Sequence, residues 1–461
     1  MLQQRTSDRR LWRDEIRATL ALAWPLVLTN LAQGLIGATD TLLLGWAGAG
    51  TLAAAALGIN LYMIFLIFGL GLMVAASPMV AKEIGARAHS VRDVRRTLRQ
   101  TMWLAAAFCV PAWLLLWHAE PILIALRQDP ALAAGAQRLL RTLQWGMLPA
   151  LLFVILRSFV SALERPLWSF IVVAAGVLLN ALLNYGLILG NFGLPAMGLT
   201  GAGIGSSLAN GAMFLAMVAV VTLHRRFRRY RLFGYFWHAD WPRFRQVWRL
   251  GLPIAVTMAL EASVFNITVF MMGLIGATSI AAHVVIIQIA TLTFMVALGL
   301  GQAATVRVGL AFGRKDEDGI ARAGWTALVI GIGFMSLMAI LMLAFPRQLI
   351  GLFLDPADPA SRLVIPLATS FLFVAALFQV FDGVQAVGAG VLRGLHDTKV
   401  PMFFAGFGYW AVGLLSGVGL GFGLGWQGLG LWIGLALGIA VVAALMLGRW
   451  VGRDRIGLTS D

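Results

Sequence analysis

The chain has 461 residues, of which 60% are hydrophobic and 12% are charged, and its mean hydropathy is +0.86. No water-soluble domain can bury so much apolar surface, so this composition excludes a soluble enzyme or a soluble binding module. The net charge of +15 would suit nucleic acid binding, but the basic residues gather in every second polar joint, as they do in membrane proteins. We therefore expect an all-α integral membrane protein and no nucleic acid partner.

Apolar stretches of about 20 residues, separated by short polar joints, predict twelve membrane-spanning helices. We expect them to form one membrane domain without soluble appendages. The predicted spans are roughly 18–45, 52–76, 98–118, 136–161, 167–189, 200–223, 250–275, 280–306, 323–345, 361–391, 401–423 and 427–448.

Lysine and arginine are concentrated in alternate joints, at 5–17, 82–99, 165, 225–249, 307–322, 393–399 and 449–455. The opposite joints carry only Arg127, Arg138, Arg141, Arg347 and Arg362. Because cytoplasmic loops are enriched in basic residues, both termini are predicted to be cytoplasmic, which requires an even number of spans. We expect a multi-pass protein of a bacterial inner membrane.

The longest polar joint, residues 224–249, holds eight arginines among aromatic residues. A basic and aromatic loop on the anionic face of a membrane is expected to lie along lipid headgroups. This joint divides the chain into an N-terminal lobe (1–223, spans one to six), a cytoplasmic linker (224–249) and a C-terminal lobe (250–461, spans seven to twelve).

An internal repeat relates the two lobes at one constant offset in residue number. Trp24-Pro25 falls on Leu252-Pro253, Gly45 on Gly273, and Leu70-Gly71 on Leu298-Gly299. Each copy has six spans, an even number, so both copies keep the same orientation in the membrane. We expect two pseudo-symmetric six-helix bundles around a V-shaped central cavity, an architecture typical of transporters and also compatible with some channels.

Three acidic residues, Asp40, Glu261 and Asp382, lie well inside the apolar helices. An ionised carboxylate at membrane depth costs about 2.5 to 3.5 kcal/mol, so a compensating partner or a function is expected for each. The sequence places no lysine or arginine at their depth. A bound cation, a proton or a water-filled cavity remains as compensation, and all three are features of cation-coupled transport.

In the first span, Asn30, Gln33, Gly37 and Asp40 follow one another at steps of three and four and form a polar stripe facing the bundle interior. Asn180 and Asn184 are one helical turn apart in the fifth span, and Thr200 opens the sixth. Their oxygens are expected to converge on the Asp40 carboxylate as a Na⁺ site, since hard donors suit a hard cation. The alternative is that Asn180 and Asn184 only hydrogen-bond between helices.

In the second half, Thr257 and Glu261 share one face of the seventh span, and Gln379, Asp382 and Gln385 share one face of the tenth. Glu261 and Asp382 are predicted to bind the coupling cation, the alternative being permanently protonated structural acids. Asp40 falls on Thr268 in the repeat, so the two lobes are expected to bind cations differently. The predicted cavity residues are Asn30, Gln33, Thr257, His283, Gln379 and Gln385, although His283 fits a core or interface position better.

These residues resemble those of the MATE (multidrug and toxic compound extrusion) family, in particular its NorM-like bacterial branch. The resemblance covers the whole chain. It rests on Trp24-Pro25, Gly37-Ala38-Thr39-Asp40, Asn180-Ala181-Leu182-Leu183-Asn184, Gly198-Leu199-Thr200-Gly201-Ala202, Leu260-Glu261 and the run from Val391 to Pro401. No single motif is diagnostic, but their order across two six-helix lobes is specific.

The resemblance implies a multidrug antiporter that exports cationic amphipathic molecules by alternating access in exchange for Na⁺ or H⁺. It implies a first-lobe cation site at Asp40, Asn180, Asn184 and Thr200. It also implies second-lobe acids at Glu261 and Asp382. If the coupling ion is Na⁺, the metal-binding residues are Asp40, Glu261 and Asp382. One departure is Phe378, where the family pattern leads us to expect an aromatic hydroxyl. We expect no cofactor besides the coupling ion, membrane lipid as a partner, and a monomer.

Two other functions are alternatives. A lipid-linked oligosaccharide flippase of the same superfamily should line its cavity with several cationic residues, and the sequence places none inside the spans. An intramembrane enzyme could use two aspartates, but no H-E-x-x-H or G-x-S-x-G motif occurs in the chain. We therefore expect a transporter and not an enzyme.

Overall fold

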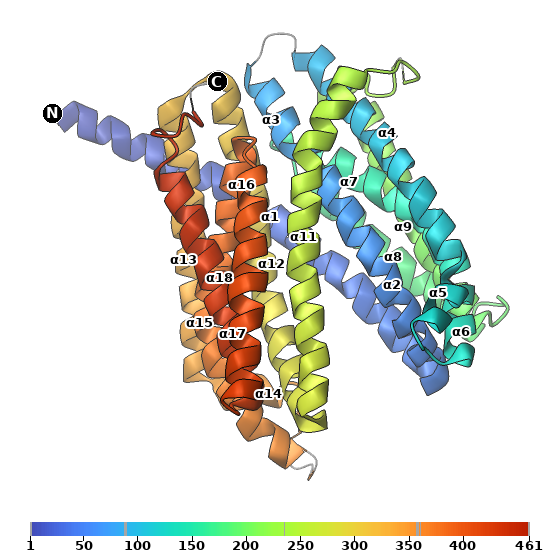
Figure 1. Ribbon diagram of the computed structural model, residues 1–461. Coiled ribbons are helices and arrows are strands. Elements are labelled where there is room, and N and C mark those ends of the chain that lie inside the picture. Colours follow the sequence, from blue (N-terminus) through green and yellow to red (C-terminus); the bar gives the residue numbers. More distant parts are fainter. Residues whose placement is uncertain (1, 87–89, 235, 356–358, 360, 460–461) are drawn as a thin grey trace. The chain divides into compact units, whose positions relative to one another are not determined.

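The computed structural model describes residues 2–86, 90–234, 236–355, 359 and 361–459, and only the backbone of residues 2–8. Within these ranges all regular secondary structure is helical (Figure 1). Twelve helices of the described chain are long and apolar enough to cross a membrane. The prediction of an all-α membrane protein with twelve spans is confirmed. Residues 87–89 of one basic joint and residue 235 of the predicted linker lie outside the described ranges.

The first half of the chain begins with one long helix and continues as a series of helices joined by short turns. Its elements are α1 (Leu2–Trp46), α2 (Ala49–Val74), α3 (Ala76–Ala86), α4 (Ser90–Trp117), α5 (Ala119–Ala125), α6 (Pro130–Leu143), the 3₁₀ helix η1 (Gln144–Gly146), α7 (Met147–Ala162), α8 (Leu167–Leu189), α9 (Gly198–Leu223) and α10 (Arg225–Arg228).

The second half repeats this plan with longer helices and two π-helical segments near its end. Its elements are α11 (Trp241–Ile275), α12 (Ala277–Arg314), α13 (Glu317–Ala344), α14 (Pro346–Gly351), α15 (Ser361–Gly394), α16 (Lys399–Ala405), the π-helix η2 (Gly406–Leu414), α17 (Leu415–Val418), the π-helix η3 (Gly419–Gly423) and α18 (Gln427–Val451).

Local sequence explains where several helices start and stop. Asp129 caps α6, because its side chain accepts hydrogen bonds from two backbone N–H groups and proline follows at the first helical position. Lys315 ends α12 in the left-handed conformation, and Asp316 then caps α13 by accepting from the backbone of Gly319. The turn between α12 and α13 is therefore fixed by two adjacent residues.

Several helices extend beyond the spans predicted from hydropathy. α1 begins at Leu2 rather than near residue 18, and α11 begins at Trp241 rather than near residue 250. These extensions are polar, so a search for apolar stretches does not include them, although they continue the same helix. We call the polar N-terminal extensions of α1 and α11 their arms.

The chain forms two compact units. Unit 1 consists of residues 1–27 and 256–461, and unit 2 consists of residues 28–255. In unit 1, the N-terminal end of α1 and the C-terminal end of α18 lie at the same end of the helices (Figure 1). The lobe boundaries drawn from the repeat, at residues 223 and 250, stay a prediction.

A buried aromatic group lies at the centre of unit 1, where Phe371, Phe378 and Trp432 are at most 2% exposed. In unit 2, α9 lies very close to α8. A Cβ atom added at Gly201 would lie only 2.3 Å from the Leu187 carbonyl oxygen. Only glycine permits that approach of α9 to α8. The close packing of these two helices positions the polar residues described next.

Candidate functional site

The carboxylate of Asp40 is held by two side chains from neighbouring helices of unit 2. Asn184 of α8 donates from Nδ2 to Asp40 Oδ1 at 2.6 Å, and Ser206 of α9 donates from Oγ to Asp40 Oδ2 at 3.0 Å. Both oxygens of the acid are therefore engaged by neutral groups. No lysine or arginine of the described chain forms an ion pair with this carboxylate.

The two asparagines of α8 present further oxygens beside Asp40. Asn180 and Asn184 are fully buried, and each donates from Nδ2 to Ser206 Oγ, at 3.3 and 3.2 Å. The Oδ1 atoms of both asparagines are buried and accept no hydrogen bond from the described residues. Buried acceptors without donors are uncommon and call for an explanation such as a bound ion.

Glycine in α9 makes room for this arrangement. A Cβ atom on Gly205 would lie 1.9 Å from Asn184 Oδ1, so any larger residue displaces the amide. Two residues earlier in α9, a Cβ atom on Gly203 would lie 2.0 Å from the hydroxyl of Thr142. The glycines of α9 therefore bring its backbone against α6 and α8 and place Ser206 at the acid.

Thr200, which the sequence predicted beside Asp40, lies elsewhere. It is in the first turn of α9, where its backbone carbonyl accepts a hydrogen bond from Thr142 Oγ1 at 3.3 Å. Six residues separate it from Ser206, which corresponds to about 9 Å along a helix. Ser206 supplies the hydroxyl at the acid instead. Sequence reasoning missed Ser206, since nothing in the sequence distinguishes it from Ser207 without knowledge of the helix face.

The stripe of α1 meets an arginine that the sequence analysis overlooked. Arg157 of α7 is 8% exposed, and it donates to Asn30 Oδ1 at 2.9 Å and to Gln33 Oε1 at 3.0 Å. The expectation that no arginine lies inside the spans is therefore wrong. Arg157 stands near the end of an apolar stretch and its partners lie on a different helix, so the sequence alone does not show that it is buried. Asn30 and Gln33 hold a buried guanidinium in this structure.

The second-lobe acids belong to unit 1 and interact with two groups not predicted from the sequence. Glu261 of α11 and Asp382 of α15 are close enough to interact electrostatically with each other. Glu261 also interacts with Arg393, in the last turn of α15, and both acids interact with the hydroxyl of Tyr409. Tyr409 is 4% exposed and its hydroxyl makes no hydrogen bond within the described residues.

The position of Tyr409 bears on the missing hydroxyl at residue 378. Phe378 is buried and packs edge-on against Trp432, with ring centroids 5.9 Å apart. Tyr409 lies in η2, a π-helical segment, and segments of this kind are frequent at functional sites. An aromatic hydroxyl is thus present near the two acids, but it comes from a different helix than the family pattern led us to expect.

The remaining predicted cavity residues of unit 1 lie in buried, packed surroundings. Gln379 donates from Nε2 to the Ala290 carbonyl at 3.1 Å and to the Thr293 hydroxyl, which ties α15 to α12. Gln385 and Thr257 are 2% and 4% exposed. His283 is fully buried against Trp432, with ring centroids 5.4 Å apart. Neither ring nitrogen of His283 has a hydrogen-bond partner among the described residues.

The donor sets favour a small, hard cation or a proton. The Asp40 group offers one carboxylate, one hydroxyl and two amide oxygens, which are the donors that Na⁺ prefers over soft ligands. The described residues contain no group of three or more His, Cys, Asp or Glu side chains able to hold a metal ion. One carboxylate among neutral groups balances a single positive charge.

Comparison with known proteins identifies the family. The chain matches the family model MatE over residues 25–186 and 253–418, two segments whose first residues are equivalent in the internal repeat. It is 58% identical, over 97% of its length and 96% of the relative, to a probable multidrug resistance protein NorM of Mesorhizobium japonicum. It is 51% identical, over 95% of its length and 93% of the relative, to a protein of the same name from Brucella suis.

Solved structures share the fold. The chain is similar to the Vibrio cholerae MATE transporter VcmN with a TM-score of 0.88 and 16% identity, over 98% of this chain and 99% of that chain. It is similar to the eukaryotic MATE transporter AtDTX14 with a TM-score of 0.84 and 19% identity, over 95% and 96%. At such low identities these structures show the fold alone. The family model and the two relatives show that this chain belongs to the MATE family of multi-pass membrane proteins.

Proposed function

We propose that this protein is a multidrug antiporter that exports cationic, amphipathic small molecules in exchange for Na⁺ or H⁺. The family membership and the relatives named as probable multidrug resistance proteins support transport rather than catalysis. The coupling cation and the class of substrate are our own inference from the two groups of buried acids.

One observation carries the proposal. The Asp40 carboxylate is held by an amide and a hydroxyl, at 2.6 and 3.0 Å, without an ion pair in the described chain. An ionised acid in a membrane helix is costly unless a cation or proton compensates it. The buried oxygens of Asn180 and Asn184 would complete the shell of such a cation. A site of this kind binds and releases a monovalent cation.

Exchange follows if the drug and the coupling cation depend on the same negative charge. A cation bound at Asp40 or at the Glu261 and Asp382 pair removes the charge that attracts a cationic drug. In the outward-open state the cation therefore weakens drug binding and the drug leaves. When the protein opens inward the cation dissociates and a new drug molecule binds, which is alternating access.

The two lobes are expected to contribute unequally. The Asp40 group contains neutral donors around one acid, whereas Glu261 and Asp382 share their surroundings with Arg393. Two carboxylates and one guanidinium carry one net negative charge, so this group also takes a single cation or proton. We propose that the Tyr409 hydroxyl lies beside the cation or proton bound by this group.

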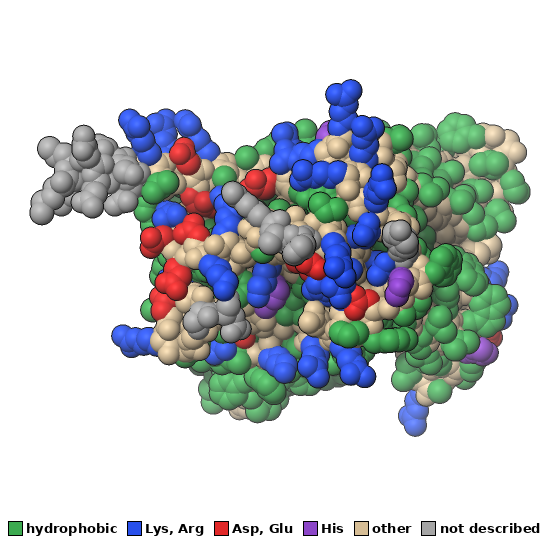
Figure 2. All heavy atoms as spheres, turned by 90° about the horizontal axis from the view of Figure 1, so that it is seen from above, with side chains coloured by type: hydrophobic (Ala, Val, Ile, Leu, Met, Phe, Trp, Pro, Cys, Tyr) green, Lys and Arg blue, Asp and Glu red, His purple; other side chains and the backbone are tan. Residues whose placement is uncertain are grey.

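The cellular setting is also part of the proposal. Twelve apolar helices support a multi-pass protein, and we place it in a bacterial inner membrane with both termini in the cytoplasm, as a monomer in contact with lipid. Lys and Arg side chains gather on the face seen in Figure 2. Contact of these residues with anionic headgroups would fix the cytoplasmic orientation.

The test is efflux of ethidium from proteoliposomes under an imposed Na⁺ gradient or an imposed pH gradient. We expect one of the two gradients to drive efflux in the wild type. Asp40→Asn and Glu261→Gln should abolish the driven efflux, because each removes a charge that the coupling cation needs. A variant in which Asp40, Glu261 and Asp382 are all neutralised gives the reference value for complete loss of driven efflux.

Two results would count against the proposal. Intact driven efflux after all three acids are neutralised would show that coupling lies elsewhere. Absence of a response to either gradient in the wild type would favour a flippase of lipid-linked oligosaccharides, for which Arg157 would be the first anion-binding candidate.

A further inference from the structure

The chain passes between its two units at two points only, and these points are equivalent in the internal repeat. The boundaries fall between Val27 and Leu28 in α1 and between Ala255 and Val256 in α11. The offset that places Trp24 on Leu252 also places the first boundary on the second. Each of these helices therefore has its arm and the first turns of its span in one unit and the rest of the helix in the other.

The arm of α1 is fastened within unit 1 by a bidentate ion pair. Arg307 of α12 donates from Nε to Glu15 Oε1 at 2.8 Å and from Nη2 to Glu15 Oε2 at 2.6 Å. The two side chains are 16% and 12% exposed, so the pair is mostly shielded from water. Paired forks of this kind are directional and strong.

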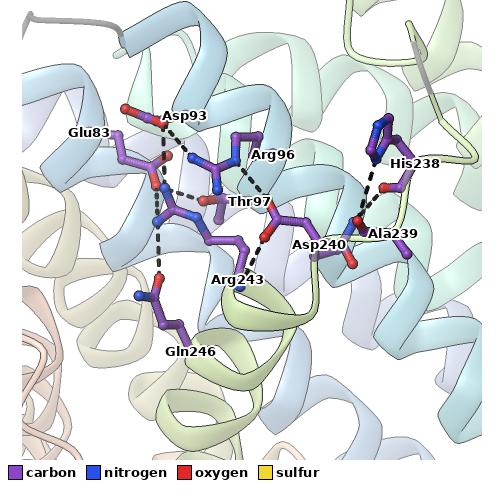
Figure 3. A network of polar contacts seen from close by, with 10 residues as sticks. Glu83, Asp93, Arg96, Thr97, His238, Ala239, Asp240, Arg243 and Gln246 are labelled. Carbon is purple, nitrogen blue, oxygen red and sulfur yellow. Dashed lines mark hydrogen bonds and ion pairs between the residues drawn. The ribbon is translucent and has the colours of Figure 1, made fainter.

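The arm of α11 is fastened within unit 2 by a network of charges (Figure 3). Arg243 Nη1 lies 2.9 Å from Glu83 Oε1 of α3, and Arg243 Nη2 lies 3.5 Å from Asp93 Oδ1 of α4. Just before the helix begins, Asp240 accepts a hydrogen bond at 2.6 Å from Arg96 Nε of α4. The start of α11 is thus held by two helices.

The two fastenings occupy equivalent places with opposite charge. Glu15 falls on Arg243 in the repeat, so they are the same position in its two copies. Their partners are near equivalents, because Arg307 lies one helical turn before residue 311, the counterpart of Glu83. One arm carries an acid and the other a base, and each forms an ion pair with a residue of opposite charge in the corresponding part of the fold.

The unit boundaries in α1 and α11 show matching close contacts. A Cβ atom on Gly299 would lie 2.9 Å from the backbone nitrogen of Val27, within unit 1. A Cβ atom on Gly71 would lie 2.4 Å from Cα of Ala255, within unit 2. Gly71 and Gly299 are equivalent in the repeat, as are Val27 and Ala255. At both boundaries glycine therefore permits a close approach of the neighbouring helix backbone.

The helices with arms are also the helices with coupling acids. α1 continues from its arm to Asp40, and α11 continues from its arm to Glu261. We propose that Glu15–Arg307 and Arg243–Glu83 are paired anchors of these two helices, and that their release and reformation is a step of each transport cycle. This inference rests on the proposed alternating-access function. The anchors are positioning residues, since they touch neither drug nor cation.

Permanent fastening would be better served by apolar packing. Replacing a shielded ion pair by well-packed apolar residues of similar volume is often neutral or stabilising, so an ion pair is not the firmest fastening available. A second ion pair of unit 1, Arg449 with Asp397, joins α18 to the turn after α15, two elements that do not cross between units. It therefore serves as a matched control for the anchors.

The first experiment measures the external concentration of coupling cation that gives half-maximal efflux from proteoliposomes. Glu15→Gln or Arg243→Gln should shift it about five- to thirtyfold, the effect of losing one such interaction from a two-state equilibrium. Exchanging the charges, with Glu15→Arg and Arg307→Glu together, should restore it to within about twofold. Neutralising Asp397 should leave it unchanged. Wild-type values in both arm variants would overturn the proposal.

The second experiment does not depend on transport, so it separates failure of the anchors from failure of the proposed function. In a Cys109→Ser background, spin labels at residues 13 and 314 report on the α1 arm, and labels at 92 and 245 report on the α11 arm. We expect two distances for each pair, with the longer one enriched by Glu15→Gln or Arg243→Gln. Labels at 399 and 455 should give one distance throughout. A single unchanged distance for both arm pairs, with saturating tetraphenylphosphonium, Na⁺ or low pH, would overturn the proposal even if efflux is driven normally.

Discussion

Asn184 Nδ2 lies 2.6 Å from Asp40 Oδ1, although the two residues are 144 positions apart in the chain. This contact joins the first span to the fifth. The side-chain oxygen Oδ1 of Asn184 accepts no hydrogen bond in the described structure. The amide therefore orients the acid while keeping an oxygen available for a cation. This geometry, and the group of Glu261, Asp382 and Tyr409 in unit 1, predict how matched variants should differ in cation binding, efflux and stability.

Ser206→Ala should alter cation binding at the first-lobe site. The hydroxyl donates to Asp40 Oδ2 at 3.0 Å, and a hydrogen bond to a charged group contributes about 1.5 to 3 kcal/mol. We expect the cation concentration for half-maximal efflux to change at least about tenfold. It should fall if the cation is H⁺, because the lost bond stabilises the ionised carboxylate, and rise if the cation is Na⁺, because an oxygen ligand is lost. Ser207→Ala is the matched control, since Ser207 donates to the Thr142 carbonyl at 2.7 Å and does not contact the acid. Equal effects of both substitutions would refute a specific role for Ser206.

Gly205→Ala should destabilise the protein and lower efflux together. The new methyl group would lie 1.9 Å from Asn184 Oδ1, and overpacking of this kind costs about 1 to 3 kcal/mol. The melting temperature in detergent measures the effect. Gly211→Ala, on the same helix with open space around it, should instead leave stability unchanged or raise it by up to about 1 kcal/mol. A stable, active Gly205→Ala variant would contradict the described contact.

Tyr409→Phe should weaken cation binding in the second lobe without unfolding the protein. The substitution removes only a hydroxyl that interacts with Glu261 and Asp382, so the aromatic packing of unit 1 stays intact. Equilibrium binding of radioactive sodium, or proton uptake on drug release, reports the loss. Tyr185→Phe, at a tyrosine that is 37% exposed, is the control. Unchanged cation binding in the Tyr409→Phe variant would show that this hydroxyl does not belong to the proposed site.

The contact of Asp240 with Arg96, at the start of α11, should weaken in acid. Burial raises the pKa of Asp240, but the hydrogen bond from Arg96 and the backbone N–H of Arg243 outweigh it, so this pKa lies below its ordinary value of 3.8. A lowered folded pKa means that the stabilisation is present above the unfolded value and is lost as pH falls through the folded value.

Thermal unfolding from about pH 6 to about pH 3 tests this dependence. Wild type should lose more stability below the ordinary pKa than Asp240→Asn, whose amide does not titrate. Asp14→Asn, at an exposed position of α1, should follow the wild type. Parallel pH curves for the wild type and Asp240→Asn would show that this carboxylate contributes nothing to stability.

The spans and the polar positions inside them could be predicted because each is a local property of the sequence. Apolar stretches define helices, and spacing of three and four places Asn30, Gln33 and Asp40 on one face. The neighbours of those faces could not be predicted in the same way. Ser206 and Arg157 reach α1 from other helices, and which side of α9 or α7 faces α1 depends on how the helices pack together.

The polar arms and the second-lobe hydroxyl escape sequence reasoning for related reasons. Hydropathy ends a span where charges begin, so it assigns the helical arms that carry Glu15 and Arg243 to the joints. Tyr409 lies in a π-helical segment, where the spacing of three and four no longer gives the facing side chains. In both cases the missing information is the partner on another helix.

Competition between drug and coupling cation on the purified protein tests the central claim most directly. Binding of tetraphenylphosphonium is titrated at increasing Na⁺ and at decreasing pH, with wild type and the Asp40→Asn variant side by side. We predict that one of the two cations raises the drug dissociation constant in the wild type, and that Asp40→Asn reduces this dependence. A dissociation constant independent of both cations in the wild type would contradict exchange at buried carboxylates.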